Sequence, residues 1–322
     1  MPHLTERALA QKPLLPGLTT TVPREYVHRA AVSEVLLTGW EPDGSPGASQ
    51  GAGDDAGFVV RAQWPRCHAL FAPDRGYQDP MLLIESVRQI GSLLAHAEFD
   101  VPFGHQFLMS DMSVTTEPEL LVADPVPTDV EMHTVCRDVV RRAGRLREMR
   151  YDVTVLRENG ARATASAAFR CMSPDVYRRM RGERPTTTGR TTPPALDPAA
   201  VGHAGPRHVV LGEPAPGTRG RWELRVDTAH PTYFDHPVDH IPGMFLLEAA
   251  RQAAHARTGV PGALLLDMRS EFVRYAELDA PCWITADPEP YGGAGDLLVR
   301  VHGSQRQETV FTAELVLRPR VR

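Results

Sequence analysis

Two stretches of the chain, 81–96 and 244–256, carry apolar residues on nearly every side of a helix. They read MLLIESVRQIGSLLAH and MFLLEAARQAAHA. A helix that is apolar all round belongs in a protein core and not on a surface. A few polar residues interrupt each run at spacings of three and four, which place them on one helix face. Each stretch therefore predicts a buried helix that carries a polar stripe.

Strand-like runs surround both helices. They cover 27–40, 58–64, 106–114, 129–140, 145–158 and 161–172 in the first half, and 207–213, 221–227, 263–277, 282–289, 296–304 and 308–318 in the second. These runs alternate apolar with polar residues or are rich in β-branched residues, as antiparallel strands are. One helix with five or six antiparallel strands, present twice, predicts the α+β class, with a curled sheet wrapped around each helix.

The two halves also match residue by residue. Both helices contain the pattern M-x-L-x-E-x-x-R-Q. Aligning Met81 with Met244 superposes the polar stripes, which are Glu85, Arg88 and Gln89 in the first half and Glu248, Arg251 and Gln252 in the second. This similarity predicts an internal duplication. We expect an N-terminal extension at 1–26, a first repeat at 27–172 with a flexible insertion at 41–57, a linker at 173–206 and a second repeat at 207–322.

Composition narrows the class of function. The net charge of −5 argues against general affinity for nucleic acids. No run of about 18 apolar residues is present, so the sequence predicts no membrane-spanning segment. The N-terminus lacks the pattern of a signal peptide, and the four cysteines are scattered without a CxxC spacing. We expect reduced thiols and a cytoplasmic location.

Four segments together resemble one known family. They are VHRAAVSEVLLTGW (27–40), FVVRAQWPRCH (58–68), LLAHAEFDVPFGHQFLM (93–109) and FDHPVDHIPGMFLLEAARQA (234–253). In them the chain is similar to the A-factor biosynthesis hotdog family, which makes γ-butyrolactone autoregulators. The last segment also resembles hotdog dehydratases that act on acyl carrier protein, but it is two residues shorter between its histidine and its glycine.

The resemblance implies a tandem hotdog fold and an acyltransferase. The family condenses a β-ketoacyl group, carried on acyl carrier protein, with dihydroxyacetone phosphate, and the ester then closes to a phosphorylated butenolide. The family also singles out the helix glutamate and arginine, which here are Glu85, Arg88, Glu248 and Arg251. We expect no cofactor.

The polar residues of both helices suit this chemistry. The fork of a guanidinium matches phosphate oxygens, so Arg88 and Arg251 are candidates to bind the substrate, together with Gln89 and Gln252 beside them. A general base must take the proton of the attacking hydroxyl. The candidates for that base are His236, His240, Glu85 and Glu248. The free N–H groups at the start of the second helix, at Gly243 and Met244, can stabilise an oxyanion.

Each of these features has a structural alternative. The stripe can be an ion-pair network that holds the two helices side by side at a pseudo-dimer interface. The H-x-x-x-H spacing of His236 and His240 can serve hydrogen bonding within a loop, or it can bind a metal ion, which we do not expect because no further ligand spacing stands out. The arginine-rich run 137–150 can attract an acidic carrier protein, or it can be a solvated face of paired strands.

The two repeats differ just before the helix. The first reads RGYQDPM (75–81) where the second reads VDHIPGM (238–244). Single hotdog proteins build their active sites between subunits, so we expect an internal pseudo-dimer with one competent site, or two unlike ones, in which His236 works with Glu85. Whether the chain also forms a homodimer stays open. The rival functions are a dehydratase or thioesterase on acyl carrier protein, and a non-catalytic protein that binds an acyl lactone.

Overall fold

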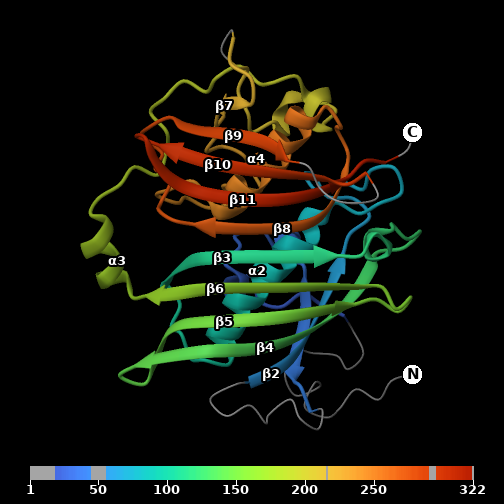
Figure 1. Ribbon diagram of the computed structural model, residues 1–322. Coiled ribbons are helices and arrows are strands. Elements are labelled where there is room, and N and C mark those ends of the chain that lie inside the picture. Colours follow the sequence, from blue (N-terminus) through green and yellow to red (C-terminus); the bar gives the residue numbers. More distant parts are fainter. Residues whose placement is uncertain (1–18, 45–55, 215–216, 290–294, 321–322) are drawn as a thin grey trace.

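The computed structural model describes residues 19–44, 56–214, 217–289 and 295–320, and it is dominated by one antiparallel sheet (Figure 1). The strands are β1 (Leu37–Pro42), β2 (Ala56–Trp64), β3 (Gln106–Thr116), β4 (Thr128–Arg142), β5 (Arg145–Leu156), β6 (Arg162–Met172), β7 (Arg221–Glu223), β8 (Leu264–Phe272), β9 (Cys282–Glu289), β10 (Leu297–Gln305) and β11 (Glu308–Arg318). The α-helices are α2 (Pro80–Ala97), α3 (Pro174–Arg181) and α4 (Gly243–Thr258). Most of the flexible insertion expected at 41–57 and most of the N-terminal extension expected at 1–26 lie outside the described residues.

The strand order shows the same topology in both halves. The order across the sheet is β1-β2-β4-β5-β6-β3-β8-β11-β10-β9-β7. In the first half the strand before the helix, β2, lies second from the edge, next to β1, and the strand after the helix, β3, lies at the centre of the sheet. In the second half β8 takes the matching central position, and β7 lies at the edge. The order of the matching strands is therefore mirrored on the two sides of the β3–β8 pair.

The pairing of β3 with β8 joins the two halves. The register runs from Asp111 opposite Glu271 to Thr115 opposite Asp267. This pairing makes a single continuous sheet, whereas the strand pattern alone predicted a curled sheet for each half. The pairing could not be predicted from the residue pattern, because an edge strand and a paired strand carry the same alternation of residues.

Both long helices lie on the same face of the sheet (Figure 1). In α2 every residue from Pro80 to His96 except Arg88 is buried, and in α4 every residue from Met244 to His255 is buried. This burial confirms the prediction drawn from their all-round apolar pattern. Asp79 caps α2, since its side chain accepts a hydrogen bond of 2.8 Å from the N–H of Met81.

Two of the predicted strand runs are mostly not strands. The segment 27–40 starts at the last residue of a short 3-10 helix, Arg24–Val27, contains a second one, Val32–Glu34, and becomes a strand only at Leu37. The segment 207–213 contributes isolated bridges rather than a strand. In both segments the backbone turns toward the polar stripe of a helix, and this contact outweighs the β propensity of the apolar residues.

The connection between the halves packs against the second half. It begins with α3, whose buried Arg181 pairs with Asp239 at 3.3 Å and with Glu277 at 2.5 Å. No helix in the described part of the chain is both long and apolar enough to cross a membrane.

Candidate active site

The polar stripe of α2 forms a buried ion-pair cluster. The carboxylate of Glu85 accepts hydrogen bonds from Arg88 at 2.7 and 2.8 Å, from Arg29 at 2.7 Å and from Gln89 at 2.8 Å. Burial by itself raises the pKa of Glu85, but the two guanidinium groups outweigh burial and lower that pKa to about 2. Glu85 is therefore a permanent carboxylate that fixes two arginines.

The stripe of α4 forms the matching cluster. Glu248 accepts from Arg251 at 2.9 and 3.0 Å and from Gln252 at 2.7 Å, and His203 lies 3.3 Å away. Burial raises the pKa of Glu248, but Arg251 and His203 more than reverse this and lower it well below its ordinary value. His203 stands where the first half has Arg29.

The two glutamines make equivalent hydrogen bonds. The side-chain oxygen of Gln89 accepts from the N–H of Leu36 at 3.0 Å, and that of Gln252 accepts from the N–H of Val210 at 2.9 Å. Their amide groups donate at 2.8 Å to the carbonyls of Glu34 and His208 respectively. Each glutamine thus anchors the segment before the strands of its own half, which is a structural role.

The clusters differ in what covers the arginine. Arg251 reaches across to α2 and donates to both carboxylate oxygens of Asp79 at 3.1 Å. In the aligned sequence the residue that matches Asp79 is Pro242, which offers no charge to Arg88. The Arg88 side chain consequently remains 20% exposed, against 10% for Arg251.

A cavity of about 240 Å³ opens beside Arg88, between the two halves. The first half contributes His28, Arg29, Arg88 and the aromatic residues Phe107, Tyr151 and Phe169. The second half contributes the loop and helix start that hold His236, His240, Gly243 and Met244. The cavity therefore combines cations from one half with histidines and a helix N-terminus from the other.

Each histidine of the loop is paired with the aspartate that precedes it. Nδ1 of His236 lies 2.5 Å from Asp235, and Nδ1 of His240 lies 2.7 Å from Asp239. Because a carboxylate only accepts, each Nδ1 carries the proton, and each Nε2 is left as the nitrogen that can take another. Burial raises the pKa of Asp235, but the bond from His236 and the charge of Arg29 lower it overall, so Asp235 is a carboxylate.

Both aspartates are held from outside the loop. Asp235 also accepts from the N–H of Ala30 at 2.8 Å, which ties the loop to the first half. Asp239 accepts from the hydroxyl of Tyr177 at 2.6 Å and from Arg181, both on α3. The orientation of each histidine thus depends on segments that are distant in the sequence.

The start of α4 faces the same cavity. Gly243 and Met244 are the first residues of the helix, so their N–H groups have no carbonyl four residues earlier within it. A Cβ on Gly243 would meet the ring of Phe272 at 3.2 Å. The glycine therefore lets the helix start pack against Phe272, in addition to leaving its N–H accessible.

One further histidine, His28, lines the cavity and is paired with the buried His96 behind it. Nδ1 of His96 lies 2.6 Å from the carbonyl of Val101, so it donates there, and Nε2 of His96 must accept from Nε2 of His28 at 2.7 Å. Burial, together with His96, Arg88 and His236, lowers the pKa of His28 to about 3. His28 is thus a neutral ring that faces the cavity beside Arg88.

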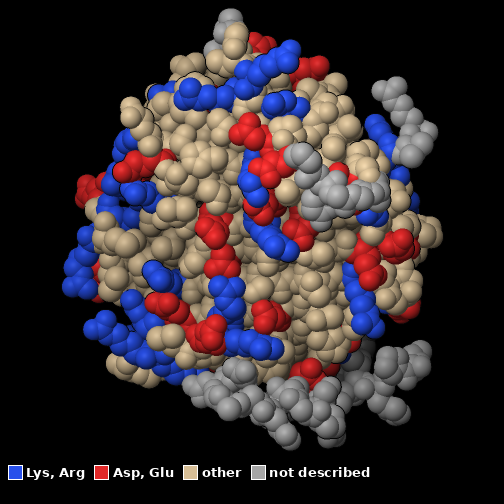
Figure 2. Space-filling model, viewed as in Figure 1, with Lys and Arg blue, Asp and Glu red and all other residues tan. Residues whose placement is uncertain are grey.

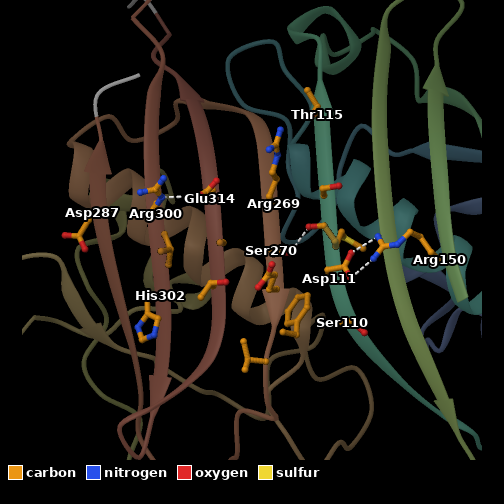
Figure 3. Close-up of a pocket in the computed structure, with 18 residues that line it drawn as sticks. Ser110, Asp111, Thr115, Arg150, Arg269, Ser270, Asp287, Arg300, His302 and Glu314 are labelled. Carbon is orange, nitrogen blue, oxygen red and sulfur yellow. Dashed lines mark hydrogen bonds and ion pairs between the residues drawn. The ribbon is translucent and has the colours of Figure 1, made fainter. Parts of the chain in front are cut away.

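A larger hollow of about 1010 Å³ lies on the opposite face of the sheet, over β3, β8, β10 and β11 (Figure 3). Two of the arginines that line it are paired with carboxylates of the same hollow. Arg150 binds Asp111 at 2.8 Å, and Arg300 binds Glu314 at 2.7 Å. The cavity between the halves holds a partly exposed guanidinium and two Asp–His pairs, so we take that cavity as the candidate active site.

Comparison with known proteins agrees with this geometry. The model of the A-factor biosynthesis hotdog domain matches residues 10–173 and 186–319. The chain belongs to the A-factor biosynthesis hotdog family.

Members of this family with curated names are similar over nearly the whole chain. A 2-oxo-3-(phosphooxy)propyl 3-oxoalkanoate synthase from Streptomyces virginiae is 49% identical, over 92% of this chain and 97% of its own length. A synthase of the same name from Streptomyces coelicolor is 40% identical, over 91% of this chain and 90% of its own length. A solved oleoyl thioesterase structure from Lactobacillus plantarum has a TM-score of 0.51 and 11% identity, covering 81% of this chain and 95% of that one, which shows the hotdog fold alone.

The structure of this family member divides the residues that the sequence singled out. Arg88, His236, His240, Gly243 and Met244 line the cavity. The other candidates do not appear in its lining: Glu85 and Gln89 lie behind Arg88, and Glu248, Arg251 and Gln252 form the second cluster. Arg251 is already paired with two carboxylates, so it has no free hydrogen-bonding edge to offer a phosphate.

Sequence reasoning gave no individual role to His28 or Arg29. Both lie in a segment that was read as a strand, although VHRAAVSEVLLTGW was among the stretches that carried the family resemblance. Two neighbouring basic residues, His28 and Arg29, in a mostly apolar run were the feature that could have indicated a functional role. The supports of the aspartates, Tyr177 and Arg181, carried no signal, because they belong to a segment that was read as a linker.

Proposed function

We propose that this chain transfers a β-ketoacyl group from a thioester to the hydroxyl of dihydroxyacetone phosphate, as the names of its curated relatives describe. The bond between the hydroxyl oxygen and the acyl carbon forms while the carbon–sulfur bond breaks. The hydroxyl proton leaves through a base and returns to the departing thiolate. The observation that carries this proposal is the single cavity that holds Arg88, two Asp–His pairs and the first N–H groups of α4.

The phosphate binds at Arg88, the more exposed of the two arginines that Glu85 pairs with. A guanidinium fork matches phosphate oxygens, and a partly exposed guanidinium in a cavity has unused donors for them. Glu85 keeps both arginines in place as their counterion. We therefore assign Glu85 a positioning role in place of the general base expected from the sequence, because a carboxylate whose pKa is about 2 is a weak base.

His236 is the general base in this proposal. Its Nδ1 proton is held by Asp235, which leaves Nε2 to take the hydroxyl proton, and its side chain lines the same cavity as His28 and Arg88. His240 has the same pairing and stands nearer the helix start, where it can return the proton to sulfur. The N–H groups of Gly243 and Met244 stabilise the oxyanion of the tetrahedral intermediate.

We also propose that the chain is a tandem of two hotdog repeats that form an internal pseudo-dimer, at 27–172 and 207–322. The matched strand order and the matched glutamine contacts support this division. In it the cluster of Glu248, Arg251 and Gln252 is structural and ties α4 to α2 through Asp79, while the first cluster serves the chemistry.

The rival functions fit the cavity less well. A dehydratase or thioesterase needs no cation for a phosphate, so it leaves the partly exposed Arg88 without a ligand. A protein that only binds an acyl lactone leaves two Asp–His pairs unexplained.

One incubation tests the proposal. The purified protein is mixed with a β-ketoacyl thioester and dihydroxyacetone phosphate, and the products are followed by mass spectrometry. A phosphorylated ester or butenolide supports the proposal. Free acid or an enoyl thioester selects the hydrolytic or dehydrating alternative, and thermal stabilisation by a lactone without turnover selects the binding protein.

A further inference from the structure

One margin of the molecule carries a large excess of arginine. Residues 140–150 and 170–184 each contain five arginines, with three acidic residues between them, in a chain whose net charge is −5. These segments are the β4–β5 turn with the start of β5, and the end of β6 with α3. They lie at the same end of the sheet, because Glu148 of β5 pairs with Arg170 of β6. Figure 2 shows blue side chains along the margin where Figure 1 places α3 and this turn.

One face of α3 packs against the second half, and the other face is exposed to solvent. Tyr177 and Arg181, four residues apart, face inward and bind Asp239. Arg178, Arg179 and Met180 are exposed between them. A helix anchored by its polar inward face thus presents two guanidinium groups and an apolar side chain to solvent.

Exposed apolar side chains accompany the charges. Met180 on α3, Val140 at the end of β4 and Phe103 before β3 are three of the seven large hydrophobic residues that are exposed among the described residues. The Phe103 loop adjoins α3, since a Cβ on Gly104 would lie 3.9 Å from the ring of Pro174. Apolar side chains set among cations are typical of a surface that binds a protein and not merely small ions.

This surface adjoins the mouth of the cavity. Gln106 lines the cavity and is the first residue of β3, where it pairs with Met172 immediately before α3. On the other side, Asp239 bonds both to Tyr177 of α3 and to His240 of the cavity. A partner bound on α3 therefore lies beside the opening through which a thioester must enter.

We infer that α3 and the β4–β5 turn form a docking surface for an acidic carrier protein that presents the acyl group on a flexible thioester arm. The inference rests on the proposed acyl transfer and names the donor for that same cavity. Charge complementarity favours this occupant, because a basic margin steers an acidic protein and accelerates its association. A free coenzyme A thioester is also anionic, but its binding does not explain the exposed apolar side chains.

The test compares two donors with one acyl group. Transfer to dihydroxyacetone phosphate is measured with a β-ketoacyl carrier protein and with the matching β-ketoacyl N-acetylcysteamine thioester, in the wild type, in R178E/R179E and in R142E/R145E. The matched control is R219E/R221E, which reverses two exposed arginines at the start of β7, the edge strand of the second half.

We expect kcat/KM with the carrier protein to fall on the order of tenfold in each margin variant, with a weaker dependence on salt. The control should be unaffected, and the small thioester should be used within about twofold of the wild-type rate by all variants. The inference is overturned if the margin variants use the carrier protein normally, or if they lose activity with both donors equally. Failure of the proposed function looks different, since wild type would then transfer from neither donor.

Discussion

Arg251 of α4 and Asp79 before α2 join the two long helices through a pair of 3.1 Å contacts. Asp79 thereby has two partners, since it also caps α2. Arg251 is in turn shared between Asp79 and Glu248, so three buried charges depend on one another. The arrangement closes the second cluster to ligands and leaves the first one open.

Replacing Asp79 with Ala should destabilise the fold. The change leaves the buried guanidinium of Arg251 with a single counterion and removes the cap of α2. Breaking a buried ion pair from one side costs about 3–5 kcal/mol, so we expect a loss of that order in the free energy of unfolding. Denaturant unfolding measures it. A loss below about 1 kcal/mol would show that the contact contributes little.

Replacing Arg88 with Gln should impair the use of the phosphorylated substrate. Arg88 is partly exposed, and Glu85 keeps Arg29 and Gln89 as partners, so we expect the protein to stay folded. The effect on kcat/KM for dihydroxyacetone phosphate should be about thirtyfold or more, equivalent to about 2 kcal/mol. The matched change in the closed cluster, Arg251→Gln, should instead act mainly on stability. Steady-state kinetics and thermal melting of both variants distinguish these outcomes, and equal kinetic losses at equal stability would contradict the assignment.

Replacing His236 with Gln should abolish most turnover without unfolding the protein. The side chain is 43% exposed, so its contribution to stability is small. Loss of a general base typically lowers kcat by about 10²–10⁴-fold. The Asp235→Asn variant should show a smaller loss, because the imidazole remains but its tautomer is no longer fixed. Single-turnover acyl transfer measures both variants, and a normal rate for His236→Gln would assign the base elsewhere.

Stability should fall as the pH drops below neutral. Burial lowers the pKa of His28 to about 3 and the pKa values of His230 and His255 to about 4. Below the ordinary histidine pKa of 6.5 these three side chains are protonated in the unfolded chain but stay neutral in the folded protein. The unfolded chain then binds more protons, so lowering the pH from 6.5 to about 3 favours unfolding. Glu85 adds a second window, since its stabilising effect is present above pH 4.5 and is lost as the pH falls through its folded value of about 2.

Unfolding free energies measured from pH 8 to pH 4 check this slope. In the His28→Gln variant the unfolding free energy should depend less steeply on pH, by up to one bound proton per molecule. The reason is that the variant lacks one of the rings that stay neutral in the folded state. An unchanged slope in that variant would mean that His28 is protonated in the folded protein or already neutral in the unfolded chain.

The sequence predicted the structure best where burial requires a regular spacing of apolar and polar residues. The all-round apolar pattern of α2 and α4 located both helices, and the repeated Glu-x-x-Arg-Gln located both clusters. The repeat could not show that Arg88 is more exposed than Arg251, because the exposure of each arginine depends on the residue that the other half places opposite it. Asp79 and Pro242 occupy matching positions, but only their packing shows that one is a counterion and the other is not.

The segment around His28 and Arg29 shows a different limit. Its alternating residues favour a strand, yet the backbone forms two short 3-10 helices so that its polar groups meet the stripe of α2. Local propensity cannot anticipate such a contact, since the partner is more than fifty residues away in the chain. The supports from α3 to Asp239 were hidden for the same reason.

The salt link from Asp79 to Arg251 also bears on how the two halves can diverge. Under the proposed division of roles Glu248 and Arg251 take no part in the reaction, yet neither can be lost alone without leaving an unpaired charge in the interior. We therefore expect an alignment of related chains to retain the same glutamate and arginine on both helices, for substrate binding on the first helix and for stability on the second.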